Sequence, residues 1–353
     1  MLWAVIIAGG GGTRFWPESR AARPKQFLKI FGKKTLLEET YGRISKLIPR
    51  SRVLVMTSSA HVKEARRLLR LPAAQVVGEP AGRNTAPAAI LAASYIYRKD
   101  PAAVIAILPA DHKIAPAASF RRSLKAAGKI ALTKHLPVTF GIKPTCAHTG
   151  YGYLEINKRL SKGIAAVKQF HEKPAAARAR AFVKSGRFLW NSGMFVWRAE
   201  DLLAAAKKYL PYASRLAQKI LTPSKNFISP TLLSRYYSDM PNISIDYALM
   251  EPLAGKILAM PAGFSWSDLG GWQAFAELLN KDRYGNRSRA RTVLIESRQN
   301  IIKSDRRLVA MIGIENCIVV DTDNALLIAA RDKAENVRHV VAELKSRGLV
   351  KYL

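Results

Sequence analysis

The sequence has little of several features that would indicate other classes of protein. It contains only two cysteines, Cys146 and Cys317, in 353 residues, and these two positions do not have metal-ligand spacing. We therefore expect both to be buried thiols of a reducing compartment. No apolar run reaches the ~18 residues of a membrane span, and the run at residues 2–8 lacks a basic leader and a cleavage site. The sequence predicts a cytoplasmic protein without a membrane segment.

Acidic residues are also scarce. The chain has 25 Asp and Glu against 57 Lys and Arg, a formal net charge of +32. The positive electrostatic potential of such a protein favours anionic ligands, among them nucleotides, sugar phosphates and nucleic acid. However, the basic residues are spread along the chain, with no long basic run and no zinc or RNA-binding signature. We therefore expect small anionic substrates and no nucleic-acid partner.

Short apolar runs alternate with helical patterns in the first 150 residues. The runs at residues 2–8, 52–58, 103–111 and 137–142 are typical of buried strands. Apolar residues at three-to-four spacing predict helices over 35–48 and 61–69, and a further helix over 200–220 is interrupted at Pro211. This alternation predicts an α/β fold with a Rossmann-like, mainly parallel mixed sheet. Ligands of such sheets bind at the carboxyl ends of the strands.

The pattern changes after Asn286. Short β-rich bursts alternate there with turn residues, and the chain ends in an amphipathic helix through Val337 and Leu344 that Gly348 closes. We therefore predict two domains, a large α/β domain at 1–284 and a small β-rich domain at 285–353. The repeat of the second domain is imperfect, but it favours a β-helix-like structure.

A glycine-rich loop follows the first predicted strand. The stretch "AGGGGTRFWPESRAARPKQF" (8–27) places bare backbone and several cations where a strand ends, as phosphate-binding loops do. The position that would be the second glycine of a P-loop is Arg14, and the dinucleotide fingerprint fails at the same residue. An arginine here can hold the β- and γ-phosphates of a triphosphate, and Lys25 can reach the α-phosphate as a point charge.

At this loop the chain resembles the sugar-phosphate nucleotidylyltransferases, and most of all the mannose-1-phosphate guanylyltransferases. The resemblance continues along nearly the whole chain, in "GEPAGRNTAPA" (78–88), "LPADH" (108–112), "GYGYLE" (150–155), "FHEKP" (170–174), "NSGMF" (191–195), "SIDYALME" (244–251) and "WSDLGGW" (266–272). It implies the nucleotide-diphospho-sugar transferase fold, with residues 1–284 as the catalytic domain and a left-handed β-helix-like domain after it.

The resemblance also implies roles for individual residues. Arg14 and Lys25 are the expected catalytic cations. Nucleotide-binding residues are expected at Ala8, Gly9, Gly10, Gly11, Gly12, Thr13, Glu79, Asn84, Thr85 and Ala88. Glu79 is the expected guanine reader, because a carboxylate can accept from both N1–H and the 2-amino group of that base. We expect Thr85 to cap the helix that follows it.

The sugar phosphate and a metal ion have their own expected ligands. Sugar-phosphate contacts are implied for Asp111, Gly150, Glu172, Lys173 and Asn191. Asp111 and Asp268 are the implied Mg²⁺ ligands, and Mg²⁺ commonly takes one or two carboxylates together with substrate phosphate oxygens. Asp246 stands in a shared motif, but its chemical role stays open; one interpretation is that it supports Lys25 or Arg14.

The implied reaction joins GTP and α-D-mannose 1-phosphate to give GDP-mannose and diphosphate. Two alternatives stay open: the same transfer to another sugar 1-phosphate, such as glucose or a heptose, and a regulatory homologue without turnover. The resemblance further implies a homodimer. The source of the high net charge is not evident from the residues.

Overall fold

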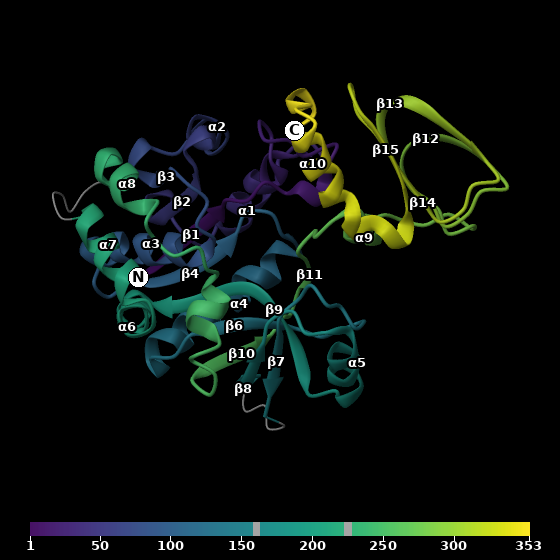
Figure 1. The fold of residues 1–353 in the computed structure, drawn as a ribbon. Helices are drawn as coiled ribbons and strands as arrows, with labels where there is room; N and C mark the ends of the chain where they lie inside the picture. Colours follow the sequence, from purple (N-terminus) through teal and green to yellow (C-terminus); the bar gives the residue numbers. More distant parts are fainter. Residues whose placement is uncertain (158–162, 222–227) are drawn as a thin grey trace. The chain divides into compact units, whose positions relative to one another are not determined.

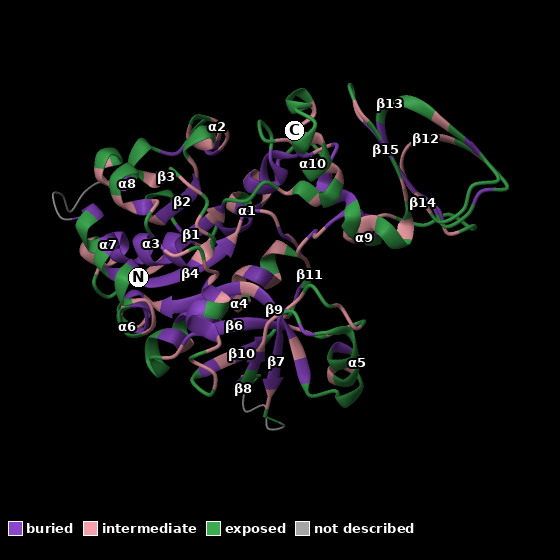
Figure 2. Ribbon diagram, viewed as in Figure 1, coloured by how far each residue is buried: buried purple, intermediate pink, exposed green. Residues whose placement is uncertain are grey.

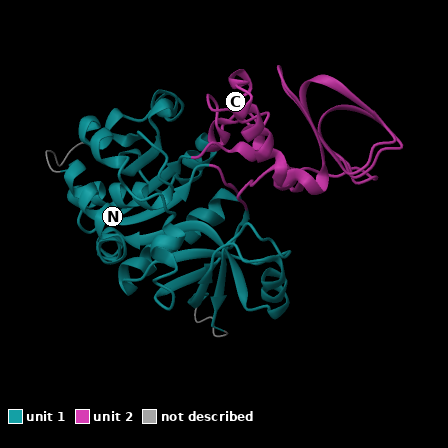
Figure 3. Ribbon diagram, viewed as in Figure 1, with its two compact units in different colours: residues 1–9, 37–110, 114–266 teal, residues 10–36, 111–113, 267–353 magenta. Residues whose placement is uncertain are grey.

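The computed structural model describes residues 1–157, 163–221 and 228–353. Contacts along the chain divide it into two compact units (Figure 3). Unit 1 comprises residues 1–9, 37–110 and 114–266, and unit 2 comprises residues 10–36, 111–113 and 267–353. Unit 2 therefore contains the glycine-rich loop from Gly10 onward as well as the C-terminal segment. The domain boundary after residue 284 stays a prediction.

Unit 1 is built on a large mixed sheet (Figure 1). Among the described residues it has nine strands, in the order β3-β2-β1-β4-β9-β6-β10-β8-β7. Their bounds are β1 (Leu2–Ala8), β2 (Val53–Ser58), β3 (Val76–Glu79), β4 (Val104–Pro109), β6 (Val138–Ile142), β7 (Tyr153–Ile156), β8 (Ala165–His171), β9 (Phe188–Arg198) and β10 (Ile257–Pro261). The pairings β3-β2-β1-β4 and β6-β10 are parallel, and only β8 and β9 run against the rest. The predicted mainly parallel mixed sheet is confirmed.

Helices cover this sheet and connect its strands. They are α1 (Leu36–Ile44), α2 (Val62–Leu69), α3 (Thr85–Lys99), α4 (Ala117–Lys134), α5 (Ala176–Ser185), α6 (Ala199–Tyr209), α7 (Pro211–Leu221) and α8 (Pro230–Tyr237). Two short strands, β5 (Lys113–Ala115) and β11 (Ser265–Ser267), pair separately. The break predicted at Pro211 is confirmed: α6 ends at Tyr209 and proline opens α7, where its missing N–H costs no helical hydrogen bond.

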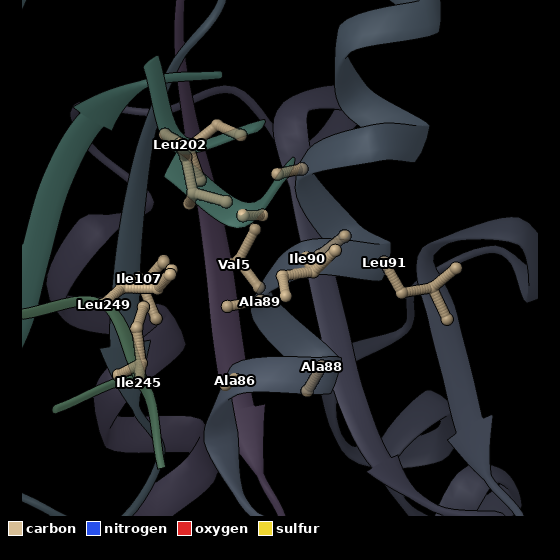
Figure 4. Close-up of a cluster of buried hydrophobic side chains, with 14 of the residues drawn as sticks. Val5, Ala86, Ala88, Ala89, Ile90, Leu91, Ile107, Leu202, Ile245 and Leu249 are labelled. Carbon is tan, nitrogen blue, oxygen red and sulfur yellow. The ribbon is translucent and has the colours of Figure 1, made fainter. Parts of the chain in front are cut away.

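The main core lies between the sheet and α3. Every residue from Ala86 to Ile96 of this helix is buried, and many of these residues are alanines that let the helix approach the strands closely. Figure 4 shows Ala89 and Ile90 of α3 beside Val5 of β1, with Leu202 of α6 near them. The strands of the sheet are buried along most of their length (Figure 2). This packing makes the sheet a rigid base for the loops at its strand ends.

Unit 2 contains a smaller sheet and a C-terminal helix. Its strands are β12 (Arg287–Ile295), β13 (Ile301–Ile312), β14 (Cys317–Asp321) and β15 (Leu326–Ala330), and its helices are α9 (Trp272–Glu277) and α10 (Val337–Ser346). β12, β13 and β14 pair in parallel and in successive turns, as the coils of a β-helix do, and β15 adds antiparallel. The predicted β-helix-like structure and terminal helix are confirmed.

Buried asparagines hold successive turns of this β-helix-like sheet together. Asn300 Nδ2 donates to Ile314 O at 2.7 Å and to Asn286 Oδ1 at 3.1 Å, and its Oδ1 accepts from Cys317 N at 2.9 Å. Neither asparagine is more than 2% exposed. Since buried backbone groups need partners, the side chains replace hydrogen bonds that the turns cannot make themselves.

Three local expectations are wrong. Cys146 is exposed rather than buried, in the loop after β6, and Cys317 at the start of β14 is only partly buried. Asn84, not Thr85, caps α3, because the Asn84 side chain accepts from Thr85 N at 3.0 Å. The Thr85 hydroxyl instead accepts a hydrogen bond from Ile245 N at 2.9 Å, so it ties the start of α3 to a distant segment.

Candidate active site

The glycine-rich loop and Asp111 both follow the carboxyl ends of neighbouring strands. β1 and β4 pair in parallel with Ile7 opposite Pro109, and Ala110 N donates to Ile7 O at 2.9 Å. Just beyond these strand ends, the chain passes into unit 2 between residues 9 and 10 and again between residues 110 and 111. The parallel pairing therefore explains why two segments one hundred residues apart are joined in unit 2.

Two residues of the glycine-rich loop need glycine. Gly10 and Gly12 have φ values of +88° and +59°, in the left-handed region that favours glycine. A β-carbon on Gly12 would also lie 2.4 Å from Cβ of Lys25, which is far inside van der Waals contact. Gly12 therefore lets the loop lie directly on Lys25.

Arg14 lies in a short 3₁₀ turn, Thr13–Phe15, that follows the glycines. Its Nε is 3.1 Å from Oε2 of Glu335, and its Nη1 is 3.5 Å from the carbonyl oxygen of Gly270. The Arg14 side chain remains 40% exposed. An exposed ion pair of this kind contributes little free energy, so an incoming phosphate can displace Glu335 from Arg14.

Lys25 joins the two aspartates predicted as metal ligands. Its ammonium Nζ donates to Asp111 Oδ2 at 2.6 Å and to the carbonyl oxygen of Asp268 at 2.6 Å. The Lys25 side chain is only 7% exposed, whereas that of Asp111 is 35% exposed. Burial by itself would raise the pKa of Asp111, but the charges of Lys25 and His112 hold the pKa below its ordinary value. Asp111 is therefore a carboxylate that solvent or a ligand can reach.

The donor set at Asp111 and Asp268 fits a magnesium ion that arrives with a nucleotide. The Asp268 carboxylate is half-buried, and its Oδ1 accepts from Gly270 N at 3.0 Å, which orients it. Mg²⁺ prefers oxygen ligands and completes an octahedron with phosphate oxygens and water. One or two protein carboxylates are therefore enough to hold such an ion.

In unit 1, Glu79 ends β3 and is almost completely buried. The hydroxyl of Tyr237, the last residue of α8, donates a hydrogen bond to Glu79 Oε1. Burial raises the pKa of Glu79 to about 7, although this hydrogen bond opposes the shift. A β-carbon on Gly9 would lie 3.6 Å from Glu79 Oε2, so the carboxylate faces Gly9, the residue that follows β1.

The other predicted nucleotide residues near Glu79 have different surroundings. Asn84 has a φ of +61° and caps α3, and Thr85 starts that helix. Ala88 has no exposed surface and lies in the core beside other residues of α3 (Figure 4). This burial does not favour the predicted contact between Ala88 and a nucleotide. The contact therefore stays a prediction.

The sugar-phosphate candidates of unit 1 form a compact cluster. Glu172 directly follows β8, and its Oε1 lies 2.9 Å from Nζ of Lys173. The Glu172 side chain is 8% exposed and that of Lys173 is 55% exposed. Asn191, a buried residue of β9, donates from Nδ2 to Asp246 Oδ1 at 2.8 Å. One buried carboxylate, one accessible ammonium and one amide can together hold a sugar phosphate.

Sequence reasoning missed three residues of these clusters. A β-carbon on Gly152 would lie 2.5 Å from Glu172 Oε2, so Gly152 contacts the cluster, whereas the predicted Gly150 is exposed and donates to the ring of His148. Thr139 and Tyr237 contact Asn191 and Glu79. The glycine alternation in "GYGYLE" is a signal for Gly152, but no local pattern marks Thr139 or Tyr237.

Comparisons with known proteins identify the families to which the two parts of the chain are similar. The family described as "Nucleotidyl transferase" matches residues 3–284, and the "MannoseP isomerase/GMP-like beta-helix domain" family matches residues 290–344. The xanthan biosynthesis protein XanB of Xanthomonas campestris is 36% identical over 98% of this chain and 73% of its own length. A mannose-1-phosphate guanylyltransferase of Klebsiella pneumoniae is 36% identical over 100% of this chain and 76% of its own length.

A solved structure resembles the chain over nearly its full length. It is a Thermus thermophilus protein described as a mannose-1-phosphate geranyltransferase, with a TM-score of 0.88 and 31% identity over 98% of this chain and 99% of that one. Across the ranges that the structure describes, no helix has both the length and the apolar character to cross a membrane. The chain therefore belongs to the nucleotidyl transferase family, in the group of the mannose-1-phosphate guanylyltransferases.

Proposed function

We propose that this protein transfers GMP from GTP to α-D-mannose 1-phosphate and releases diphosphate. The observation that carries the proposal is the buried side chain of Lys25: its ammonium is held against Asp111, and its Cβ lies against Gly12 of the glycine-rich loop. A buried cation next to bare backbone suits a nucleotide phosphate, and the named relatives add the choice of GTP and mannose 1-phosphate.

In this reaction an oxygen of the sugar phosphate attacks the α-phosphorus of GTP. The bond from the α-phosphorus to the bridging oxygen of the β-phosphate breaks, and diphosphate leaves on the opposite side. The attacking phosphate is already ionised, so no general base is needed. Catalysis then consists of positioning and of neutralising charge.

The chain's own residues have separate tasks in this mechanism. Arg14 leaves Glu335 to hold the β- and γ-phosphates, and Lys25 neutralises charge at the α-phosphate. Glu79 accepts from the guanine edge, with Asn84 and Thr85 at the neighbouring helix start. Mg²⁺, held by Asp111 and Asp268, would supply further neutralisation of phosphate charge when bound.

Glu172, Lys173 and Asn191 bind the second substrate. Lys173 is the accessible cation of their cluster and takes the phosphate of the sugar, whereas the Glu172 carboxylate accepts from ring hydroxyls. We further propose that Asp111 contacts the sugar phosphate and that Gly150 contacts the sugar through its main chain.

Diphosphate release from the purified protein tests the proposal. GTP, ATP, UTP and dTTP are each combined with mannose 1-phosphate, glucose 1-phosphate and a heptose 1-phosphate in the presence of Mg²⁺. We expect release with GTP and mannose 1-phosphate. Release with a different pair would contradict the substrate assignment, and binding of GTP without any release would indicate a regulatory homologue.

We also propose that the protein acts as a cytoplasmic homodimer. Several large apolar side chains of the β12–β15 sheet are exposed, among them Leu308 at 61%, Ile312 at 69% and Ile328 at 65%. Exposed apolar patches mark interaction sites, and a second copy of this chain offers an equally apolar face. Sedimentation of the wild-type protein and of Ile312→Glu tests this: we expect a dimer and a monomer, and a monomeric wild type would contradict it.

A further inference from the structure

Asp246 belongs to the motif at residues 244–251 that the chain shares with its family, but the sequence does not indicate what Asp246 does. It begins a π-helical turn, Asp246–Met250, whose later residues are buried. The hydrogen bond between Ile245 N and Thr85 Oγ1 anchors the residue before it. Asp246 itself is half-buried.

The structure fixes the orientation of the amide that contacts Asp246. Asn191 Oδ1 accepts from Gly193 N at 3.2 Å, and Thr139 Oγ1 lies 3.1 Å from the same oxygen. A backbone N–H can only donate, so this atom of Asn191 must be the oxygen. Nδ2 therefore faces Asp246 Oδ1, at 2.8 Å, and the Asp246 carboxylate is an acceptor there.

A second carboxylate lies near Asp246. Gly152, whose carbonyl accepts from Asn191 N at 2.8 Å, leaves the space that Glu172 Oε2 occupies. Burial and the nearby charge of Glu172 together raise the pKa of Asp246 to about 7, against smaller opposing effects from its own backbone N–H, Asn191 and Lys173. Glu172 thus pairs with the exposed ammonium of Lys173, and the charge of Asp246 also acts on this ammonium.

This arrangement is costly for the protein unless donors reach it. Two neighbouring carboxylates repel each other, and buried acceptors need hydrogen-bond donors. Lys173 pairs with one carboxylate oxygen of Glu172, and Asn191 donates a hydrogen bond to one carboxylate oxygen of Asp246. Sugar hydroxyls are neutral donors that can approach both carboxylates at once.

We propose that Asp246 is a specificity-determining residue for the sugar: with Glu172, it accepts hydrogen bonds from neighbouring hydroxyls of the sugar ring. The inference rests on the proposed function and adds a named contact to it. Besides its own proposed contact with the sugar, Asn191 positions Asp246, because its amide holds Asp246 Oδ1. The substrate class is a hexose 1-phosphate with adjacent free hydroxyls.

The variant Asp246→Asn tests this contact. It keeps the volume of the side chain but replaces one acceptor oxygen with a donor. We expect kcat/KM for mannose 1-phosphate to fall about 10- to 100-fold, as for loss of a hydrogen bond to a charged group. KM for GTP should change less than about twofold. Asp239→Asn changes an exposed aspartate shortly before this motif, is the matched control and should behave as wild type.

Deoxy analogues of mannose 1-phosphate distinguish a direct contact from a structural effect. If Asp246 accepts from one hydroxyl, the loss caused by Asp246→Asn should disappear with the analogue that lacks this hydroxyl and persist with the others. An equal loss with the 2-, 3-, 4- and 6-deoxy compounds would overturn the proposal. If Asp246→Asn does not fold, Asp246→Ser is compared with the same analogues.

Failure of the proposed function would look different. If the wild type turns over no sugar phosphate with GTP, calorimetric binding of mannose 1-phosphate and glucose 1-phosphate replaces turnover. Binding that weakens in Asp246→Asn would then support the sugar contact although the reaction assignment is wrong. Binding that is unchanged in the variant, or absent from the wild type, would overturn the contact.

Discussion

The ammonium of Lys25 lies 2.6 Å from Oδ2 of Asp111, and it also binds the main chain of Asp268. This single buried cation therefore holds both predicted metal ligands of unit 2 in place. Without it, Asp111 would lose the charge that keeps its pKa low. Lys25 thus has a structural task as well as the proposed electrostatic one.

The first prediction concerns this cation. Lys25→Ala should lower kcat/KM about 10²- to 10³-fold, the usual cost of one preorganised electrostatic contact. Thermal unfolding should confirm that the variant is folded. Lys29→Ala removes an exposed lysine four residues away and serves as the control. Near-normal turnover of folded Lys25→Ala would contradict the mechanism.

The second prediction concerns the pH dependence of GTP binding. Glu79 has a pKa of about 7, so it loses its charge as the pH falls below that value. A protonated Glu79 accepts less well from guanine, and KM for GTP should therefore rise about tenfold from pH 8 to pH 6. Steady-state kinetics measure this rise. Glu79→Gln should show a high KM throughout, and its remaining pH dependence reports the titration of GTP itself.

The third prediction concerns the partner of Glu79. Tyr237→Phe removes the hydrogen bond that holds Glu79 Oε1 and opposes its pKa shift. The midpoint of the pH effect on KM for GTP should move above 7, and the free energy of unfolding should fall by about 1–2 kcal/mol. Tyr236→Phe alters the neighbouring, more exposed ring and is the control. An unchanged midpoint would show that Tyr237 does not influence Glu79.

The fourth prediction compares two glycines of one loop. Both Gly10→Ala and Gly12→Ala carry the ~1–2 kcal/mol cost of a left-handed residue. Only Gly12→Ala also forces a β-carbon against Lys25, whereas nothing lies within 4 Å of a β-carbon on Gly10. Urea denaturation should therefore show that Gly12→Ala loses at least about 1 kcal/mol more. Equal losses would mean that the loop moves away from Lys25 without cost.

The fifth prediction concerns the β-helix-like sheet. Asn300→Ala leaves Cys317 N and Ile314 O without the side chain that satisfies them. The free energy of unfolding should fall by about 2–4 kcal/mol, since each buried unsatisfied group costs about 1–3 kcal/mol. Asn157→Ala, at an exposed asparagine, should change it by less than about 0.5 kcal/mol. A small effect at Asn300 would indicate that the turns are held by the strands alone.

Much of the fold was predictable because its signals are local. The run at residues 2–8 ends at four glycines and became β1 with the same bounds. Pro211 marked the helix break for the same reason, since a proline acts on its immediate neighbours. The cap of α3 was assigned one residue too late, because Asn84 and Thr85 are both good capping residues and only the backbone decides between them.

Residues of the candidate site could be proposed from the sequence only where they stand in a motif shared with the family. Glu79 stands in such a motif, but Tyr237 is 158 residues away and was brought to it by the packing of α8. Asn191 and Asp246 are likewise 55 residues apart, and no spacing rule connects them. Contacts of this kind depend on tertiary packing, which neither periodicity nor composition encodes.

One labelling experiment tests the central claim most directly. The purified protein is incubated with Mg²⁺, mannose 1-phosphate and GTP that carries a radioactive α-phosphate, with Lys25→Ala in parallel. The proposed attack on the α-phosphorus predicts that label enters GDP-mannose in the wild type and far more slowly in the variant. Label that stays in GTP, or that enters no sugar nucleotide, would contradict the proposed reaction.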